Sequence, residues 1–463
     1  MSSIIILGAL IFLMVAAYRG MSVILCAPAA ALLAVLLTEP SAVLPLFTGL
    51  FMEKMAGFVK LYLPVFLLGA VFGKLIEISG FSQAIVASVI RVVGAQRAIL
   101  SIVIVSALLT YGGVSLFVVV FAVYPFAAEM FRQGNIPKRL IPGAVALGAF
   151  SFTMDAFPGS PQIQNIIPTT FFHTTTWAAP WLGVTGSALI MAMGMGYLEW
   201  QRRSAFAAGE TYGTGHTNEL EVSLTASSIP PIVALLPLLI VGGANFAFTW
   251  LIPKFYGPTN ETLLGGMTTP VVTQIEKVTA IWAVEGALML GILTIVAFGY
   301  RAVAAKFTAA AKSAVDGALM ASINTAAVYG FGAVMAALPG FVMIRNALKL
   351  IPNPLVNEAI TVTTLAGITG SASGGLGIAL GSMAEQFLAA AHAAGISPEV
   401  LHRVASMASG GMDTLPHNGA VITLLAVTGL THRQSYRDIF AITCIKTLTV
   451  FLVIAIHGIT GIV

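Results

Sequence analysis

The sequence predicts an all-α polytopic membrane protein made of two inverted-topology repeats, with re-entrant hairpins and broken helices. Three observations support this prediction. The composition is strongly apolar, apolar runs of membrane-spanning length recur from end to end, and a similar pair of backbone breaks occurs in each half. Of 463 residues, 58% are hydrophobic and 9% are charged, against roughly 25% charged in soluble domains. The mean hydropathy of +0.95 agrees with a membrane protein.

The apolar runs predict about 11–14 membrane segments, since a spanning helix needs about 20 apolar residues. The first run has no positively charged flank of the kind that precedes a cleavable signal peptide, so we expect it to be retained as a helix. The candidate spans are residues 3–18, 21–38, 61–79, 98–110, 116–131, 138–153, 176–198, 229–252, 277–299, 316–338, 356–369, 375–394 and 436–459.

Several function classes find no support in the sequence. The net charge of +4 comes from scattered Lys and Arg, which argues against nucleic-acid binding. The absence of a phosphate-binding loop argues against ATP as the energy source. The two cysteines form no metal-ligand pattern. No Gly-x-Ser-x-Gly or His-Glu-x-x-His motif supports a membrane hydrolase. We therefore expect neither an enzyme nor a bound cofactor or metal.

Charge distribution predicts how the chain is divided and oriented. The first repeat covers residues 1–198, a polar linker covers 199–228, and the second repeat covers 229–463. Arg202 and Arg203 mark the linker as cytoplasmic under the positive-inside rule, which places both termini in the periplasm. The semi-polar segment of the first half then lies outside and that of the second half inside, as in inverted repeats. The bacterial inner membrane is the expected location.

Each half contains two breaks in its apolar sequence, separated by the same distance. Hairpin breaks are predicted near residues 111–115 and 370–375, and helix breaks near 154–161 and 412–419. Gly112 precedes Met154 by 42 residues, and Gly370 precedes Met412 by the same number. Irregular backbone at membrane depth is tolerated only where it is buried in protein or lines a cavity. The recurrence favours a binding site built from both halves.

The hairpin breaks carry groups that suit an anion. Free N–H groups and the positive dipole end of a helix form a site for a carboxylate, and serine hydroxyls add donors. Small residues that allow close helix packing are the alternative interpretation. The candidate substrate-binding residues at these breaks are Gly112, Gly113, Ser115, Gly370, Ser371 and Ser373.

The helix breaks add carboxylates and further polar groups. Asp155 and Asp413 each precede a proline, and they are either proton- or cation-coupling carboxylates or N-caps of the next helix. Polar side chains that complete the predicted substrate site are Gln162, Asn165, His417 and Asn418. His173 is interpreted as structural. Because neither motif contains Lys or Arg, we expect the substrate to be a small monocarboxylate whose charge is balanced by a co-transported cation.

Residues 412–421 and 158–168, with the stretch at 428–436, resemble the GntP family of permeases along nearly the whole chain. These are bacterial proton-coupled symporters of gluconate and related hydroxy acids. The two motifs look closest to the hydroxybutyrate-permease branch and differ from gluconate permeases at the second-half break. The resemblance implies a fold similar to the ion-transporter superfamily, with a scaffold and a transport part that holds two re-entrant hairpins, and a homodimer.

Together these observations predict a secondary transporter that couples a small hydroxy- or short-chain monocarboxylate to protons by alternating access. The expected partners are this organic anion and the lipid bilayer. Sodium coupling is one alternative, since carboxylate, hydroxyl, amide and carbonyl oxygens also bind Na⁺. An ion channel is the alternative from another class, and it would conduct far faster than a carrier.

Overall fold

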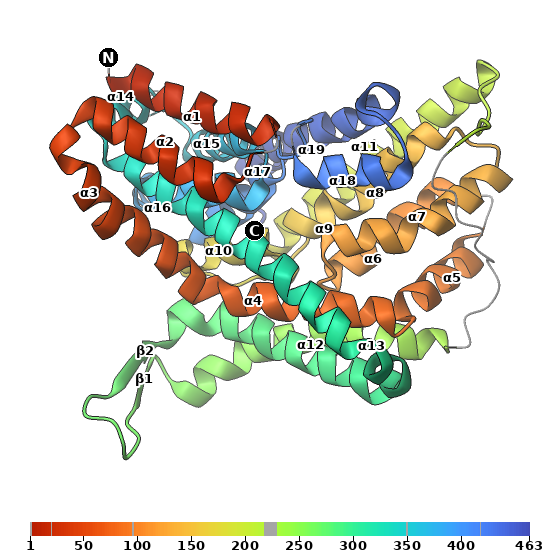
Figure 1. Cartoon of the computed structure of the whole chain (residues 1–463), viewed down its shortest axis with the longest axis horizontal. Coiled ribbons are helices and arrows are strands. Elements are labelled where there is room, and N and C mark those ends of the chain that lie inside the picture. Colours follow the sequence, from red (N-terminus) through yellow and green to blue (C-terminus); the bar gives the residue numbers. More distant parts are fainter. Residues whose placement is uncertain (1, 20, 95–96, 217–228, 349–350, 417) are drawn as a thin grey trace.

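The computed structural model describes residues 2–19, 21–94, 97–216, 229–348, 351–416 and 418–463. The described chain is almost entirely helical, which confirms the predicted all-α polytopic class. A short antiparallel hairpin, β1 (Thr259–Thr262) with β2 (Val271–Gln274), is the exception and projects from one side of the molecule (Figure 1). His417 and residues 217–228 of the predicted linker lie outside the described residues.

In the first half the helices at 2–18, 23–38, 98–111 and 116–133 follow the predicted spans closely, whereas those at 81–93 and 163–172 had no predicted span. The helix that begins at Pro180 runs to Ala207, inside the predicted linker. In order, the helices of the first half are α1 (Ser2–Tyr18), α2 (Val23–Thr38), the 3₁₀ turn η1 (Pro40–Ala42), α3 (Val43–Leu46), the π-helical turn η2 (Phe47–Phe51), α4 (Met52–Ile78), α5 (Phe81–Val93), α6 (Ala98–Tyr111), α7 (Leu116–Gln133), the 3₁₀ turn η4 (Lys138–Leu140), α8 (Ile141–Ala149), α9 (Phe152–Asp155), α10 (Ile163–Phe172) and α11 (Pro180–Ala207).

After the linker, the helices from Ile275 onward repeat the order that begins with α4 in the first half. The helices of the second half are α12 (Pro231–Tyr256), α13 (Ile275–Ala337), α14 (Pro339–Leu348), α15 (Pro354–Thr369), α16 (Ala372–Ala393), α17 (Pro398–Ser409), α18 (Gly419–Thr428) and α19 (His432–Thr460). In each half a long helix leads to a short helix, a helical hairpin, a broken helix and a final long helix. The division into two repeats and their inverted orientation stay predictions.

Within the described chain, several helices are long and apolar enough to cross a membrane. They are the continuous helical segment Pro40–Ile78 and the helices Pro180–Ala207, Pro231–Tyr256, Ile275–Ala337 and His432–Thr460. Shorter apolar helices lie between them. The chain is therefore a multi-pass membrane protein.

Two helices are longer than the sequence predicts. The span expected to begin at residue 61 already begins at Pro40, a residue favoured in the first helical turn. The spans 277–299 and 316–338 are joined in α13, which departs from helical geometry only at Gly299. Residues 300–316 contain no Gly or Pro and are rich in Ala and Lys, which are strong helix formers, so nothing ends the helix there.

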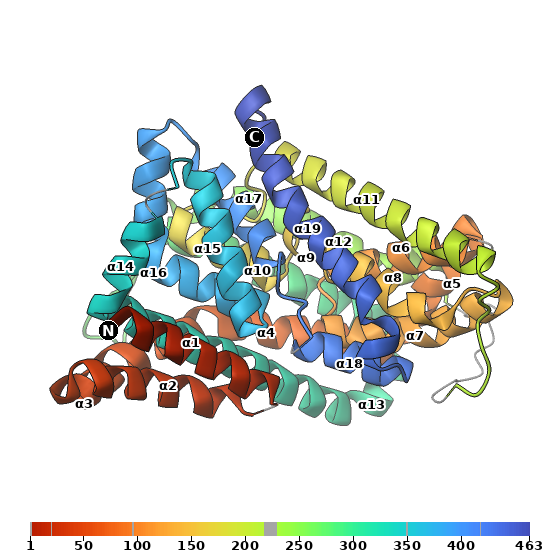
Figure 2. The ribbon, with the colours of Figure 1, turned by 90° about the horizontal axis from the view of Figure 1, so that it is seen from above.

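The long helices α4 and α13 pack closely against each other. α12 covers another side of α13, and α11 lies beside α19 (Figure 2). α2 packs against α13, and α1 packs against α2, α14 and α15; α1 and α2 share a separate apolar core with residues such as Val328 and Phe331. The main core joins α4–α19 around the two sets of breaks.

Candidate functional site

The first hairpin tip joins α6 to α7 and is shaped by a glycine. Gly113 has a φ of +92°, and a Cβ there would lie 3.2 Å from Leu288 and 3.3 Å from Pro161. Glycine is therefore required both by the backbone conformation and by the close neighbours. The Gln162 side-chain amide donates a hydrogen bond of 2.7 Å to the Thr110 carbonyl and so holds the tip against the first helix break.

The tip and the helix break of the first half line one cavity of about 830 Å³, within the usual range of roughly 300–1,000 Å³ for ligand sites. Three predicted site residues lie in its wall: Gly113, Ser115 and Gln162. Gln164 lines it too, and its buried Oε1 has no hydrogen-bond partner among the described residues. The sequence showed Gln164 in the polar run after Asp155 but gave no reason to choose it.

Two helices begin at this cavity without a side-chain cap. Ser115 is the N-cap of α7 and Gln162 is the N-cap of α10, and neither side chain accepts a hydrogen bond from its helix. The first N–H groups of each helix have no intrahelical acceptor and favour an anion. Both N-termini therefore give the cavity an anion-binding character. The predicted residue Gly112 is packed against Leu238 and is not part of the cavity lining.

Charged side chains from outside the two motifs also line the cavity. Lys74 and Glu77 on α4 form an ion pair of 2.9 Å and both face the cavity. Their side chains are 27% and 31% exposed, so this pair is partly solvated. The fold brings α4, and with it this pair, against the tip at 112–115.

The second hairpin tip is organised by its own polar groups. Gly370 ends α15 with a φ of +60°, and the Ser371 hydroxyl caps α16 by accepting a hydrogen bond of 3.1 Å from the Gly374 N–H. The Ser373 hydroxyl lies 3.3 Å from that of Thr325. Asn324, beside Thr325, lines the cavity. The predicted residues Gly370, Ser371 and Ser373 thus lie behind the cavity wall rather than in it.

Asn418 caps α18, the helix after the second helix break, and neither Asp155 nor Asp413 caps the helix that follows it. The Asn418 carbonyl oxygen accepts hydrogen bonds from the N–H groups of Ala420 and Val421, and its amide donates to the carbonyls of Gly370 at 2.9 Å and Asp413 at 2.8 Å. The capping alternative for Asp155 and Asp413 is therefore wrong. The signal was present in the sequence, since Asn directly before an apolar run is a preferred N-cap.

Asp155 is a buried carboxylate at the point where the two halves meet. It is 1% exposed, and neither carboxylate oxygen has a hydrogen-bond partner among the described residues. The Ser406 hydroxyl donates a 2.6 Å hydrogen bond to the backbone carbonyl of Asp155. A Cβ on Gly410 would collide with the carboxylate, so glycine is needed for this approach.

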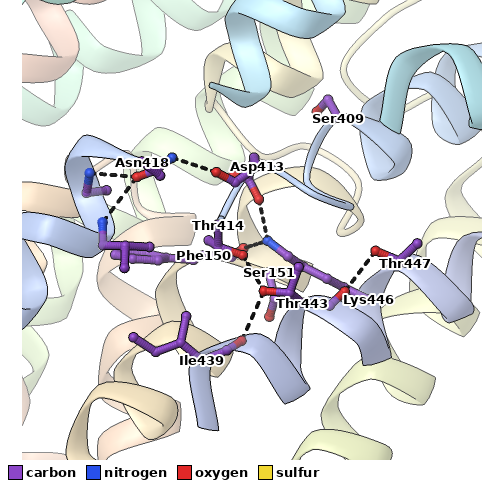
Figure 3. Close-up of polar contacts among 12 residues, drawn as sticks. Phe150, Ser151, Ser409, Asp413, Thr414, Asn418, Ile439, Thr443, Lys446 and Thr447 are labelled. Atoms are coloured by element: carbon purple, nitrogen blue, oxygen red, sulfur yellow. Dashed lines mark hydrogen bonds and ion pairs between the residues drawn. The ribbon is translucent and has the colours of Figure 1, made fainter. Parts of the chain in front are cut away.

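Asp413 is paired with a lysine that the sequence left among scattered charges. Lys446 on α19 donates a 2.6 Å hydrogen bond to Asp413 Oδ1 and a 2.8 Å hydrogen bond to the Phe150 carbonyl (Figure 3). Both side chains of the ion pair are buried, at 2% and 6% exposed. Phe150 is the C-cap of α8, so Lys446 connects the broken helix of the first half to that of the second.

Asn165 lies behind the cavity in a fully buried cluster. Its amide donates to the carbonyls of Ser160 and Thr176, both at 2.9 Å. Its carbonyl oxygen lies 3.2 Å from His402 Nε2 and accepts a 3.0 Å hydrogen bond from Arg403. The amide and the carbonyl oxygen of the Asn165 side chain are therefore bonded to other groups of the protein. Sequence reasoning missed His402 and Arg403, which lie on α17 and reach the first half only in the folded protein.

The four breaks are connected in series by these contacts. Gln162 links the first tip to the first helix break, Lys446 links the two helix breaks, and Asn418 links the second helix break to the second tip. The cavity opens on the first tip and first break only.

A sequence relative and two solved structures resemble the chain. It is 58% identical over 472 residues to the "Uncharacterized transporter YxjC" of Bacillus subtilis, with both chains fully covered. The YdaH transporter of Alcanivorax borkumensis matches 92% of the chain, and is itself matched over 91%, with a TM-score of 0.56 at 16% identity. MtrF of Neisseria gonorrhoeae, described with a class of antimetabolite efflux pumps, matches over 90% and 85% with a TM-score of 0.53 at 13% identity. At these identities the two structures show a shared fold. No protein-family model matches the chain.

Proposed function

Given that the chain belongs to the same family of membrane transporters as YxjC, we propose that it is a secondary active carrier of a small hydroxy- or short-chain monocarboxylate, driven by protons. Alternating access would expose the cavity to either side of the membrane in turn. The resemblance to the GntP family supports this substrate class. A homodimer in the bacterial inner membrane, with both termini in the periplasm, completes the proposal.

The observation that carries the proposal is the cavity at the first tip. The uncapped N-termini of α7 and α10 converge on it, and Ser115, Gln162 and Gln164 add polar groups. We assign the substrate carboxylate to these helix ends. Lys74 supplies a positive charge nearby, and its partner Glu77 holds it while the cavity contains no substrate.

The rest of the wall favours an alkyl body over a polyol. Apolar side chains from α4, α7 and α13, such as Val65, Phe121 and Met320, make up much of the lining. Each hydroxyl of a sugar acid would need a hydrogen-bond partner, because an unpaired buried polar group costs about 1–3 kcal/mol. A short-chain hydroxy acid therefore suits this cavity better than gluconate.

The coupling role is assigned to Asp155. Asp413 already has a cationic partner in Lys446, whereas the Asp155 carboxylate has no hydrogen-bond partner among the described residues. A buried carboxyl without a partner is most stable with a proton bound. Proton binding and release at Asp155 would change the charge at the contact between the two helix breaks and so bias the movement between the two access states.

Uptake by purified protein in liposomes tests the proposal. We expect saturable uptake of 3-hydroxybutyrate, with counterflow, that increases when the substrate side is made acidic. Gluconate should compete weakly. Flux that does not saturate and shows no counterflow would indicate the channel alternative. Uptake that ignores the pH gradient and requires Na⁺ would indicate sodium coupling.

A further inference from the structure

We propose that the Lys446 ammonium is a tethered cation that occupies, between the two helix breaks, the position a free Na⁺ would otherwise take. The inference rests on the proposed function and deepens it. It gives a structural reason for this carrier to use protons and to be indifferent to Na⁺.

The ligands of the ammonium are of the kind that bind sodium. Nζ lies 2.6 Å from a carboxylate oxygen of Asp413 and 2.8 Å from the backbone carbonyl oxygen of Phe150. In secondary transporters, unwound backbone carbonyls and the C-terminal ends of half-helices are the groups that coordinate Na⁺ or protons. Phe150 is such an end, since it is the C-cap of α8 and carries the negative end of the helix dipole.

The surroundings of this position are closed and hydrogen-bonded. The hydroxyls of Thr414 and Thr443 lie 2.6 Å apart beside the ammonium (Figure 3). The Tyr436 hydroxyl donates a 3.1 Å hydrogen bond to the Thr414 carbonyl. The Asn418 amide donates to the Asp413 carbonyl. Lys446 itself is only 2% exposed. The oxygens around the ammonium are thus held by hydrogen bonds to other groups of the protein. A different cation would meet the same oxygens if the Lys446 side chain were removed.

Tethering gives the ammonium an advantage over a dissolved ion. A group attached to the same chain acts at an effective concentration of the order of millimolar or more, and its binding needs no loss of translational freedom. Sodium would have to displace the ammonium and leave a second positive charge beside it. That competition excludes Na⁺ as long as Lys446 is present.

Two buried carboxyls, Asp155 and Glu358 on α15, have no hydrogen-bond partner among the described residues, and the proposed function assigns the proton to Asp155. The charges of Lys446, Asp413 and Arg403 all act on the Asp155 carboxylate. Arg403 is bound by carbonyl oxygens and Asn165, and Asp438 at the start of α19 is paired with Arg139. The further ionisable groups on the elements packed against α19 lie on α17, α11 and η4: Glu399, His402, Tyr197, Glu199, Arg202, Arg203 and Lys138. α19 itself also carries His432, Arg433, Tyr436, Arg437, Cys444 and His457.

Thermal unfolding of the purified full-length protein in NaCl and in choline chloride at equal ionic strength tests the inference. We expect the wild-type melting temperature to be the same in both salts. In Lys446→Ala the vacated position should bind Na⁺, so its melting temperature should rise with NaCl concentration and also with ethylammonium chloride. The double variant Asp413→Asn/Lys446→Ala removes the carboxylate ligand and should lose this response. Lys306→Ala, at an exposed position of α13, is the matched control and should behave as wild type.

Either of two results would overturn the inference: a wild-type melting temperature that depends on Na⁺, or a folded Lys446→Ala protein that responds to neither cation. If Lys446→Ala fails to fold, the wild-type comparison and Lys446→Arg, which keeps the charge and should stay insensitive to Na⁺, still decide the question. The outcome is independent of the proposed function, because it needs no substrate. A protein that passes this test but takes up no carboxylate would refute the proposed function alone.

Discussion

The buried ion pair of Lys446 and Asp413 makes a prediction with a defined magnitude. Removing one partner of a buried pair leaves an uncompensated charge and costs about 3–5 kcal/mol. The side chains are 2% and 6% exposed, so solvent can do little to reduce this cost. We expect Lys446→Met and Asp413→Asn each to lower the free energy of unfolding by about 3–5 kcal/mol.

The double variant Asp413→Asn/Lys446→Met should be far less destabilised than the sum of the singles. It leaves no isolated charge, and its main loss is the hydrogen bond to the Phe150 carbonyl, which costs about 1–3 kcal/mol when that buried acceptor is left unpaired. The cycle therefore predicts a coupling energy of at least about 3 kcal/mol.

Denaturant-induced unfolding in mixed micelles provides the measurement for the four proteins of the cycle. Lys74→Met is the matched control, because the Lys74–Glu77 pair is partly exposed and such pairs contribute at most about 1 kcal/mol. The reasoning fails if Lys446→Met costs no more than Lys74→Met, or if the two single effects simply add.

Three further predictions concern the cavity and the coupling carboxyl. Asp155→Asn should fold and retain counterflow, because it replaces an unpaired carboxylate by a neutral isostere, but it should lose accumulation driven by a pH gradient; retained accumulation in liposomes would assign the proton to another group. Gly113→Ala should destabilise the tip by about 1–2 kcal/mol from its positive φ alone, with added contact against Leu288. Gly57→Ala, in the interior of α4 with open space around it, should stabilise the protein by up to about 1 kcal/mol, and equal unfolding transitions for the two variants would count against this account of the tip. Gln164→Leu should weaken binding of a hydroxy acid about twofold to tenfold, through loss of the Oε1 acceptor for the substrate hydroxyl, and an unchanged half-saturation concentration for uptake would remove Gln164 from the site.

The helices could be predicted from the sequence because their apolar length is a local property. The spans at 98–110, 116–131 and 356–369 agree with α6, α7 and α15 to within a few residues. The joining of two predicted spans in α13 was missed because the positive charges after Gly299, at Arg301, Lys306 and Lys312, favoured a separate cytoplasmic surface helix. The Ala content of the segment instead favours one continuous helix.

The site could be predicted only in part, since its contacts join distant parts of the chain. The glycine breaks and the polar run after Asp155 identified Gly113, Ser115 and Gln162, which do line the cavity. Lys446 lies 33 residues from Asp413 on another helix, and nothing local connects them. Its position as a lone charge within an apolar run was the available signal, because an ionisable residue inside a membrane helix usually has a specific partner.

Proton movement during substrate uptake tests the central claim most directly. Liposomes containing the purified protein and a pH-sensitive dye inside are given 3-hydroxybutyrate outside at equal pH, with no Na⁺ present. A proton-coupled carrier predicts that the lumen becomes acidic as the substrate enters, and that Asp155→Asn abolishes this acidification while counterflow continues. Saturable entry of the anion with no proton movement, or entry only when Na⁺ is added, would contradict the account.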